Sequence, residues 1–329
     1  MKIVMLDRMG TDFSLEKKVF REEGATFIVT YFKDADELRS IAWDADILMF
    51  NDANISKDII ESLDKCKMII RYGIDYDTVD LEAAGKKGIY VCNAPSYGIY
   101  DVAEHTMALL LSVCKHIPLA DTCARTGKWS ADHVKKVRRL RGKTLGLVGF
   151  DKIARVVAAR AKAFEMEILV SDPYSSAESA EADGARLVDF PTLLENADYV
   201  SLHSPLTAET RHMMGMPQFK LMKKEAVLIN TGRGGLVNEN ELIFALLSGE
   251  IAGAALDVFE TEPLSPQSKL IGMDNVVLTP HVAWNSYEGE NDLHQEVTNN
   301  VVRVLRGETP IHVVNEKYLK GRLFLKNTD

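Results

Sequence analysis

The sequence is poor in the residues that build disulfides and metal centres. Its four cysteines, Cys66, Cys92, Cys114 and Cys123, include no Cys-x-x-Cys pair. Its eight histidines include no His-x-x-x-His or His-Glu-x-x-His spacing. We therefore expect reduced, mostly buried thiols and no metal site.

Long apolar runs and an excess of positive charge are missing as well. No uninterrupted apolar stretch approaches the ~18 residues of a membrane helix, and the run at Met1 is too short for a signal peptide. The formal net charge of -9 would repel nucleic acid and anionic lipid. The basic run Lys135–Arg141 is one short cluster, expected to be a solvated loop. The composition therefore predicts a cytoplasmic protein that binds neither nucleic acid nor membrane.

Length and composition fit a globular enzyme with more than one domain. At 329 residues the chain exceeds the usual size of a single hydrophobic core. Apolar residues make up 46% and charged residues 26% of the sequence, without low-complexity or repeated segments, which argues against disorder.

Apolar strands alternate with amphipathic helices in two series, which predicts an α/β protein with two doubly wound parallel sheets. In the first series the predicted strands are residues 2–6, 27–31, 47–50, 68–71 and 90–92, and the helices are residues 15–23, 35–43, 57–64 and 80–87. In the second series the predicted strands are residues 144–149, 167–171, 199–203, 226–230, 254–258 and 276–278.

Two further helices shape the expected domain organisation. The longest apolar helical segment, Val102–Leu119, suits either a core or a subunit interface. The charged segment Tyr287–Leu305 is expected to return to the first domain, because both sheets are complete without it. The first domain is then discontinuous, residues 1–98 with 286–329, around an inserted domain of residues 99–285, and a cleft separates the two.

A turn typical of nucleotide sites lies in residues 142–155, which form a strand, a tight turn and a helix start. Free helix N–H groups and the helix dipole favour the pyrophosphate of a dinucleotide there. The pattern Gly149-x-Asp151-x-x-Ala154 lacks the second glycine of the fingerprint, so alone it favours an ordinary turn. Asp172, after the next strand, has the spacing of a carboxylate that accepts ribose hydroxyls. That residue predicts NAD rather than NADP.

Seven motifs follow in order along nearly the whole chain: residues 71–80, 102–105, the turn at Gly149, 202–207, 229–234, 257–263 and 279–284. Through these motifs the chain resembles the D-isomer-specific 2-hydroxyacid dehydrogenases. This family includes bacterial relatives of the carboxy-terminal binding protein corepressors. The resemblance implies a Rossmann NAD-binding domain inserted in a flavodoxin-like substrate domain. It also implies hydride transfer between NAD(H) and C2 of a small 2-hydroxy or 2-keto acid.

In this family an arginine, a glutamate and a histidine carry out the chemistry, and the resemblance assigns these roles to Arg233, Glu262 and His281. The planar guanidinium of Arg233, at the carboxyl edge of a sheet, suits a carboxylate and the adjacent carbonyl oxygen. His281 titrates near neutral pH and can exchange a proton with the substrate oxygen. Glu262 would hold the imidazole and favour its charged form. Without the motifs, a structural ion pair and a satisfied histidine are the alternatives.

The run 257–263 holds two more carboxylates. Glu260 is set aside, because the family's partner stands directly before proline. Asp257 resembles the acceptor for the nicotinamide carboxamide. The other cofactor-lining positions that the resemblance implies, for which ordinary turn and cap residues are the alternative, are Gly149, Lys152, Ile153, Asp172, Ser204, Pro205, Thr210, Thr231 and Gly232.

Substrate contacts are expected from the first domain, where Arg71, Gly73 and Ile74 follow a strand and could face a carboxylate. Trp284 resembles the pocket tryptophan of the corepressors, with plain core as the alternative. Aspartate replaces the family's usual glycine at two places. Asp151 would oppose the pyrophosphate, and Asp75 would oppose a substrate carboxylate, unless it faces solvent or a cationic group.

The sequence leaves competing functions. The leading hypothesis is a homodimeric dehydrogenase, joined through Val102–Leu119, for an unphosphorylated acid. Phosphoglycerate dehydrogenases place an arginine in the loop near Asp52, and an acidic residue there would repel a phosphorylated substrate. The alternatives are an NAD(H)-sensing interaction protein and a weakly active relative impaired at Asp151. Corepressor scaffolds carry long disordered tails, so the short flanks of this sequence favour the enzyme.

Overall fold

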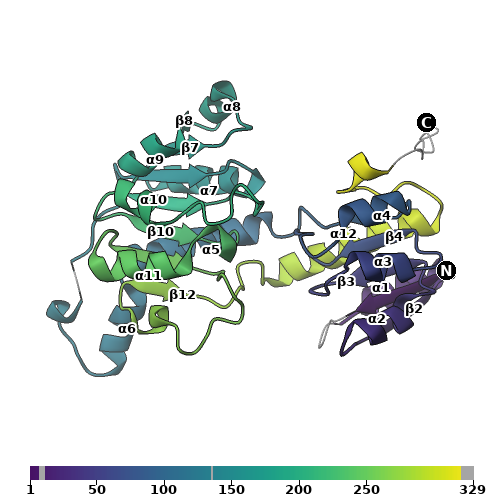
Figure 1. The fold of residues 1–329 in the computed structure, drawn as a ribbon. Helices are drawn as coiled ribbons and strands as arrows, with labels where there is room; N and C mark the ends of the chain where they lie inside the picture. Colours follow the sequence, from purple (N-terminus) through teal and green to yellow (C-terminus); the bar gives the residue numbers. More distant parts are fainter. Residues whose placement is uncertain (7–11, 135, 320–329) are drawn as a thin grey trace. The chain divides into compact units, whose positions relative to one another are not determined.

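The computed structural model describes residues 1–6, 12–134 and 136–319, and it divides into two compact α/β units (Figure 1). Unit 1 consists of Met1–Gly98 and Ser286–Asp329, and unit 2 of Ile99–Asn285. Lys135, at the start of the basic run, and residues 320–329 lie outside the described residues.

Unit 1 is built on a five-stranded parallel sheet with the order β2-β1-β3-β4-β5, the flavodoxin-like arrangement. Its strands are β1 (Lys2–Leu6), β2 (Thr26–Thr30), β3 (Ile47–Phe50), β4 (Met68–Arg71) and β5 (Tyr90–Cys92). Its helices are α1 (Ser14–Glu22), α2 (Ala35–Ala42), α3 (Lys57–Ser62), α4 (Leu81–Lys86) and α12 (Tyr287–Leu305).

Unit 2 is built on a seven-stranded parallel sheet with the order β12-β11-β10-β9-β6-β7-β8. Counted within the unit, this is the Rossmann order, so the predicted fold class is confirmed. The strands are β6 (Thr144–Val148), β7 (Glu167–Ser171), β8 (Arg186–Leu187), β9 (Tyr199–Leu202), β10 (Val227–Asn230), β11 (Gly253–Leu256) and β12 (Val276–Leu278). The helices are α5 (Ile99–Cys114), α6 (Ile117–Arg125), α7 (Lys152–Ala163), α8 (Ala177–Ala182), α9 (Phe190–Asn196), α10 (Met216–Leu221) and α11 (Glu239–Ser248).

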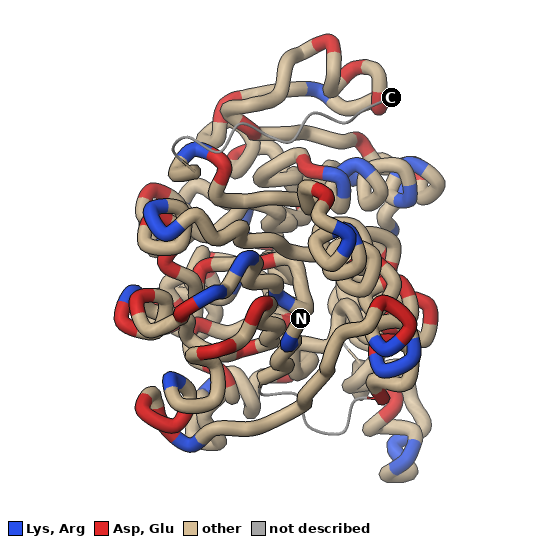
Figure 2. Tube along the Cα trace, turned by 90° about the vertical axis from the view of Figure 1, so that its right-hand side faces the viewer, with Lys and Arg blue, Asp and Glu red and all other residues tan. Residues whose placement is uncertain are grey.

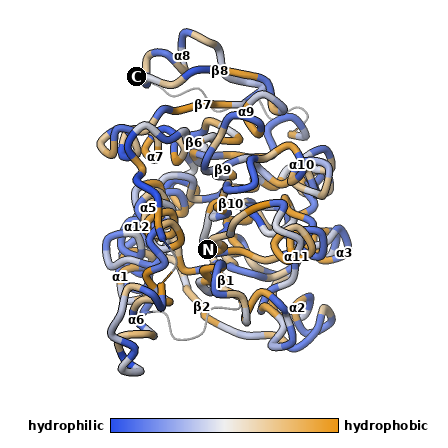
Figure 3. The backbone as a smooth tube through the Cα atoms, turned by 90° about the vertical axis from the view of Figure 1, so that its left-hand side faces the viewer, coloured by the Kyte–Doolittle hydropathy of each residue, from blue (hydrophilic) through white to orange (hydrophobic). Residues whose placement is uncertain are grey.

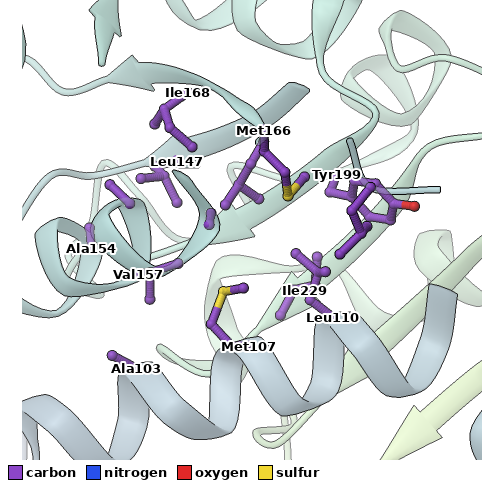
Figure 4. Close-up of a cluster of buried hydrophobic side chains, with 14 of the residues drawn as sticks. Ala103, Met107, Leu110, Leu147, Ala154, Val157, Met166, Ile168, Tyr199 and Ile229 are labelled. Atoms are coloured by element: carbon purple, nitrogen blue, oxygen red, sulfur yellow. The ribbon is translucent and has the colours of Figure 1, made fainter. Parts of the chain in front are cut away.

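Both sheets are covered on their two faces, which explains why the central strands are apolar throughout rather than alternating. Strands β3, β9, β10 and β11 are buried at every position. Figure 3 colours the hydrophobic stretches of the backbone orange and the hydrophilic ones blue. On one face of the unit 2 sheet, α5 and α7 pack together through Ala103, Met107, Ala154 and Val157 (Figure 4). This face supports the loops at the carboxyl ends of β6 and β10.

The predicted single helix Val102–Leu119 is wrong. Helix α5 ends at Cys114, His116 takes a left-handed conformation with φ of 50°, and α6 starts with Pro118 in its first turn, where a missing N–H costs nothing. Much of α5 is core of unit 2 rather than free surface, since eight of its residues are buried. Among the described residues no single helix is long and apolar enough to cross a membrane. Only α5 and α6 taken together reach that length and composition, across a bend of 61°.

Helix α12 belongs to unit 1 although it follows unit 2 in the chain. Its apolar side, formed by Leu293, Val297, Val301 and Val304, packs into the core beneath β1, β3 and β4. The segment after it continues along β5, where the buried Asn315 side chain bonds the Val91 N–H and the Ile89 carbonyl, each at 2.9 Å. The chain thus returns to pack on its first sheet.

Candidate active site

Unit 2 brings His281 and Glu262 into direct contact. His281 Nδ1 lies 2.7 Å from Glu262 Oε2, and the other carboxylate oxygen accepts the Phe259 N–H at 3.0 Å. Both side chains are partly exposed, at 43% and 35%, so a small ligand has access to the imidazole. The free ring nitrogen, Nε2, is the one on the side away from the carboxylate.

Arg233 contributes positive charge to this pair. Burial alone would raise the pKa of Glu262, but the hydrogen bonds from His281 and Phe259 and the charges of His281 and Arg233 outweigh it and lower the pKa. Glu262 therefore stays ionised to lower pH than an ordinary glutamate. The three residues that sequence reasoning singled out lie in one electrostatic neighbourhood.

The loop that carries His281 is clamped by Asp257, which has no exposed surface. Its carboxylate accepts the Thr279 hydroxyl at 2.6 Å and the N–H groups of Val282 and Ala283 at 3.0 and 2.9 Å. Burial would raise the pKa of Asp257, but hydrogen bonds from His105, Thr279 and these N–H groups lower it. The clamp holds His281 in its left-handed conformation, with φ of 54°.

His105 on α5 completes this clamp and was missed as a site residue. Its Nε2 lies 2.9 Å from the Thr279 hydroxyl and 3.5 Å from Asp257 Oδ1. The neighbouring Thr106 hydroxyl lies 2.8 Å from that of Thr231, after β10. His105 lies in the motif at 102–105 and Thr106 directly follows it, but the sequence alone suggests no chemical role for this motif. The residues that His105 and Thr106 contact are more than 100 positions away in the chain.

Arg233 follows β10 in a loop that packs closely on the segment before Glu262. A Cβ atom on Gly234 would lie only 1.8 Å from the Phe259 carbonyl oxygen, so only glycine permits this approach. Asn230 braces the loop, because its side chain accepts the Gly232 N–H at 3.1 Å and donates to the Arg233 carbonyl at 2.9 Å. The backbone contact explains how Arg233 and Glu262 come together.

Glu260 has a different partner from Glu262. Its side chain lies 2.6 Å from His212 Nε2 and accepts the Glu239 N–H at 3.1 Å, while Glu239 accepts the Glu260 N–H at 3.4 Å. Burial, followed by the charge of Glu260, raises the pKa of Glu239 despite that backbone hydrogen bond. The choice between the two glutamates made from sequence thus agrees with their contacts.

The turn after β6 packs tightly against the loop after β9. Gly149 has φ of 90°, and a Cβ atom there would lie 2.7 Å from the His203 carbonyl carbon. His203 is buried beside the turn, with Nε2 2.9 Å from the Ser201 hydroxyl. Burial lowers the pKa of this histidine, and the charge of Asp151 acts in the opposite direction. His203 is a second residue that the sequence reasoning did not single out.

Asp151 caps the helix at this turn, a role that the sequence reasoning did not foresee. It is the N-cap of α7, and its Oδ1 accepts the Ala154 N–H at 2.8 Å. The exposed Lys152 and the half-buried Ile153 follow as the first helical residues. The carboxylate therefore occupies the helix N-terminus at which an anion would bind.

Asp172 ends up beside the same turn. Its Oδ2 accepts the Phe150 N–H at 2.8 Å, and its Oδ1 accepts the Tyr174 N–H at 2.8 Å. The carboxylate stands just beyond β7, next to the helix N-terminus, as the sequence spacing implied. Oδ2 also accepts the Ser175 hydroxyl at 3.2 Å, so the lone-pair capacity for a further donor lies on Oδ1.

The other cofactor-lining candidates lie in the loops after β9 and β10. The Ser204 hydroxyl donates to the Val148 carbonyl at 3.2 Å, and the Thr210 hydroxyl donates to the Pro205 carbonyl at 2.6 Å. These hydrogen bonds are those of ordinary turn residues, so contacts of these positions with a cofactor stay a prediction. On the last loop of the unit, Trp284 Nε1 donates to the His281 carbonyl at 3.1 Å.

The substrate-loop candidates lie in unit 1, separate from the residues above. Arg71 ends β4, and its Nε and Nη1 donate to the carbonyls of Asn51 and Asp75, both at 2.9 Å. The Asp75 carboxylate lies 3.3 Å from Nη1, and the Asp52 carboxylate lies 3.8 Å from Nη2. Gly73, with φ of 154°, lies against the guanidinium. Asp75 thus faces Arg71, an arrangement that the sequence could not decide.

Charges elsewhere are mixed in sign, as Figure 2 shows for the helices and loops in view. In the basic run, Arg138 lies 3.5 Å from Glu225 and Arg141 lies 2.8 Å from Glu165. Within the described part of the chain, no group of three His, Cys, Asp or Glu side chains could hold a metal ion.

Comparison with known proteins gives one consistent family. Residues 107–283 match the family described as D-isomer specific 2-hydroxyacid dehydrogenase, NAD binding domain. The chain is 42% identical over 271 residues to a glyoxylate reductase of Thermococcus litoralis, covering 80% of this chain and 82% of that protein. It is 40% identical over 316 residues to a D-3-phosphoglycerate dehydrogenase of Methanocaldococcus jannaschii, covering 95% of this chain but only 59% of that longer protein.

A solved structure supports the same grouping. The D-lactate dehydrogenase of Aquifex aeolicus, complexed with NAD and lactic acid, superposes with a TM-score of 0.84 at 26% sequence identity. The alignment covers 93% of this chain and 96% of that one.

Proposed function

The chain belongs to the D-isomer specific 2-hydroxyacid dehydrogenase family, and from this membership and the geometry of unit 2 we propose that it is an NAD(H)-dependent oxidoreductase for a small, unphosphorylated D-2-hydroxy or 2-keto acid. The observation that carries the proposal is the 2.7 Å hydrogen bond between His281 and Glu262 beside Arg233. An imidazole oriented by a carboxylate, next to a guanidinium, suits proton transfer to an anionic carbonyl substrate.

Each member of the trio has one task in this proposal. Arg233 binds the substrate carboxylate and polarises the C2 oxygen. His281 Nε2 gives a proton to that oxygen during reduction and takes it back during oxidation. Glu262 holds Nδ1–H, which fixes the tautomer and stabilises the imidazolium. Bound NAD(H) supplies or accepts the hydride at C2.

The residues around Gly149 fit a dinucleotide with one exception. Asp172 lies beside the turn with acceptor capacity on Oδ1 for a ribose hydroxyl, and its charge would repel the extra phosphate of NADP. The α7 N-terminus is suited to an anion, but the Asp151 cap already occupies it. We therefore assign NAD(H) as the cofactor and Asp151 as a residue that weakens its binding. Lys152, Ile153, Ser204, Pro205, Thr210, Thr231, Gly232 and Asp257 are assigned to its surroundings.

Unit 1 is the substrate-binding domain in this proposal, with Arg71, Gly73 and Ile74 assigned to binding of the acid. Trp284 of unit 2 is assigned as a further substrate-binding residue. Asp75 and Asp52 flank the Arg71 guanidinium at 3.3 and 3.8 Å. Two carboxylates beside that guanidinium would repel a phosphate group on the substrate. This charge balance favours an unphosphorylated acid.

We further propose a cytoplasmic homodimer. All four cysteines are free, which fits a reducing compartment. Because half of the residues of α5 are buried in the core of unit 2, the interface would be formed by its outer side together with α6, where Ile117 is 53% exposed, and by the following loop, where Trp129 is 88% exposed. Light scattering at low protein concentration should give about twice the 36.6 kDa chain mass, and the mass of a single chain would contradict the dimer.

The test of function is NADH oxidation with a panel of 2-keto acids, followed optically. His281→Ala and Arg233→Ala should each lower kcat/KM by about 10²–10⁴-fold while NADH binding persists. His212→Ala is the matched control, since His212 also pairs with a glutamate, at 2.6 Å, but outside the trio. Near-normal turnover of His281→Ala, or equal loss in His212→Ala, would remove His281 from the mechanism.

A further inference from the structure

A charged cluster is buried in the core of unit 1. Glu16, on the first turn of α1, has no exposed surface, although Phe13 and Phe20 share its side of the helix. Its Oε1 accepts hydrogen bonds from the Tyr72 hydroxyl and from His294 Nδ1, the latter at 2.5 Å. Its Oε2 is buried and has no hydrogen-bond partner among the described residues. A carboxylate in such a place is costly, and packing alone does not require it.

His294 extends the cluster to α12. It is 7% exposed, and the rings of Phe13 and Tyr72 pack edge-on against it, with centroids at 5.9 and 5.5 Å. Its Nε2 points toward Glu290, whose carboxylate lies 4.0 Å away at the partly exposed side of the same helix. The imidazole thus faces a carboxylate at each nitrogen. Glu16 and His294 form a buried, hydrogen-bonded pair between α1 and α12.

Tyr72 connects this pair to the loop that carries Arg71 and Gly73. It lies between them in the chain, is 2% exposed, and continues the β4 ladder through a 2.7 Å hydrogen bond from its N–H to the Phe50 carbonyl. In extended backbone, neighbouring side chains point to opposite faces. A Tyr72 side chain fixed on the α1 and α12 side therefore fixes where Arg71 and the Gly73 N–H are presented.

We propose that Glu16 and His294 are positioning residues for the substrate loop: they fix the Tyr72 hydroxyl, and Tyr72 sets the direction in which Arg71 and Gly73 meet the carboxylate of the acid. The inference rests on the proposed function of that loop. A hydrogen bond to a charged acceptor is directional, whereas apolar packing is not. The buried charge thus provides an orientation that a leucine at position 16 would not.

The test compares wild type with Tyr72→Phe and Glu16→Gln, which keep the side-chain shape. With the best keto acid of the panel and saturating NADH, both variants should raise the KM of the acid by about three- to tenfold, with kcat within about twofold. The Kd of NADH should not change, because the cofactor residues lie in unit 2. Glu22→Gln is the control, since Glu22 is exposed on the same helix.

Two further measurements separate positioning from plain stability. Thermal unfolding of each variant checks that unit 1 is folded. The double variant Glu16→Gln with His294→Gln should have a KM no higher than Glu16→Gln alone, because the two residues act as one pair. An unchanged KM in folded Tyr72→Phe and Glu16→Gln would overturn the inference. A higher KM accompanied by losses of kcat and of NADH affinity would overturn it as well, because it would indicate a general structural defect. A wild-type protein that reduces no keto acid would show instead that the proposed function has failed.

Discussion

Asp151 offers the sharpest test of the proposed cofactor site, because its carboxylate caps α7 and, in the proposal, would also repel the cofactor phosphates. Its Oδ1 accepts the Ala154 N–H at 2.8 Å, in the position where a helix N-terminus would bind an anion. Asparagine keeps the cap but removes the charge, and glycine removes both. Comparing Asp151→Asn with Asp151→Gly therefore separates the two roles.

The magnitude follows from Coulomb's law. Two unit charges about 6 Å apart interact by roughly 3 kcal/mol at an effective dielectric of about 20. Solvent exposure of Asp151, salt and the neighbouring Lys152 reduce this to about 1 kcal/mol, or roughly fivefold in Kd. Asp151→Asn should bind NADH about fivefold more tightly at low ionic strength, with little loss of stability. Asp151→Gly should bind comparably and lose only a few tenths of a kcal/mol of stability.

The assay is fluorescence titration of NADH at low and high salt, with Lys162→Gln, at the far end of α7, as a control for helix charge. The gain in Asp151→Asn should shrink at high salt, because screening already weakens the repulsion in wild type. Equal Kd values for wild type and Asp151→Asn at low salt would refute the reasoning. That result would mean the carboxylate turns away from the phosphates when NADH binds.

Three more predictions concern specificity, acid stability and packing. Asp172→Ser should reduce the preference for NADH over NADPH, measured as the ratio of the two Kd values. An unchanged ratio would mean that Asp172 does not determine this preference. Burial raises the pKa of Glu239, so ionising this side chain destabilises the folded state once the pH rises above the usual pKa of a glutamate. Glu239→Gln should therefore raise Tm at pH 7 and leave it nearly unchanged at pH 4. The opposite pattern would contradict the raised pKa. Gly234→Ala should lower the free energy of unfolding by about 1–3 kcal/mol or more, because its Cβ would meet the Phe259 carbonyl at 1.8 Å. Gly272→Ala, where nothing lies within 4 Å of the added Cβ, should be tolerated. Chemical denaturation measures both variants, and equal stability of the two would exclude the clash.

The sequence predicted the strands of both sheets well, because buried parallel strands consist of short continuous apolar runs. Eleven of the strands lie within two residues of their predicted bounds, and β1, β3, β4, β5, β7 and β12 match them. The edge strand β8 was missed, since its two residues carry no such run. The break between α5 and α6 was missed for a related reason: apolar residues continue across it, and only the left-handed His116 before Pro118 ends the helix.

The sequence by itself determined the fold class, the family and the candidate trio, because these depend on local periodicity and on short motifs in order. The tertiary structure decided what depends on contacts between distant residues. It paired His281 with Glu262, and Glu260 with His212, and it turned Asp75 toward Arg71. It also buried Glu16 against residues 56 and 278 positions away, Tyr72 and His294. Hydrogen bonds and charge interactions act over a few ångströms of space, whatever the separation along the chain, so only folding reveals which carboxylate meets which cation.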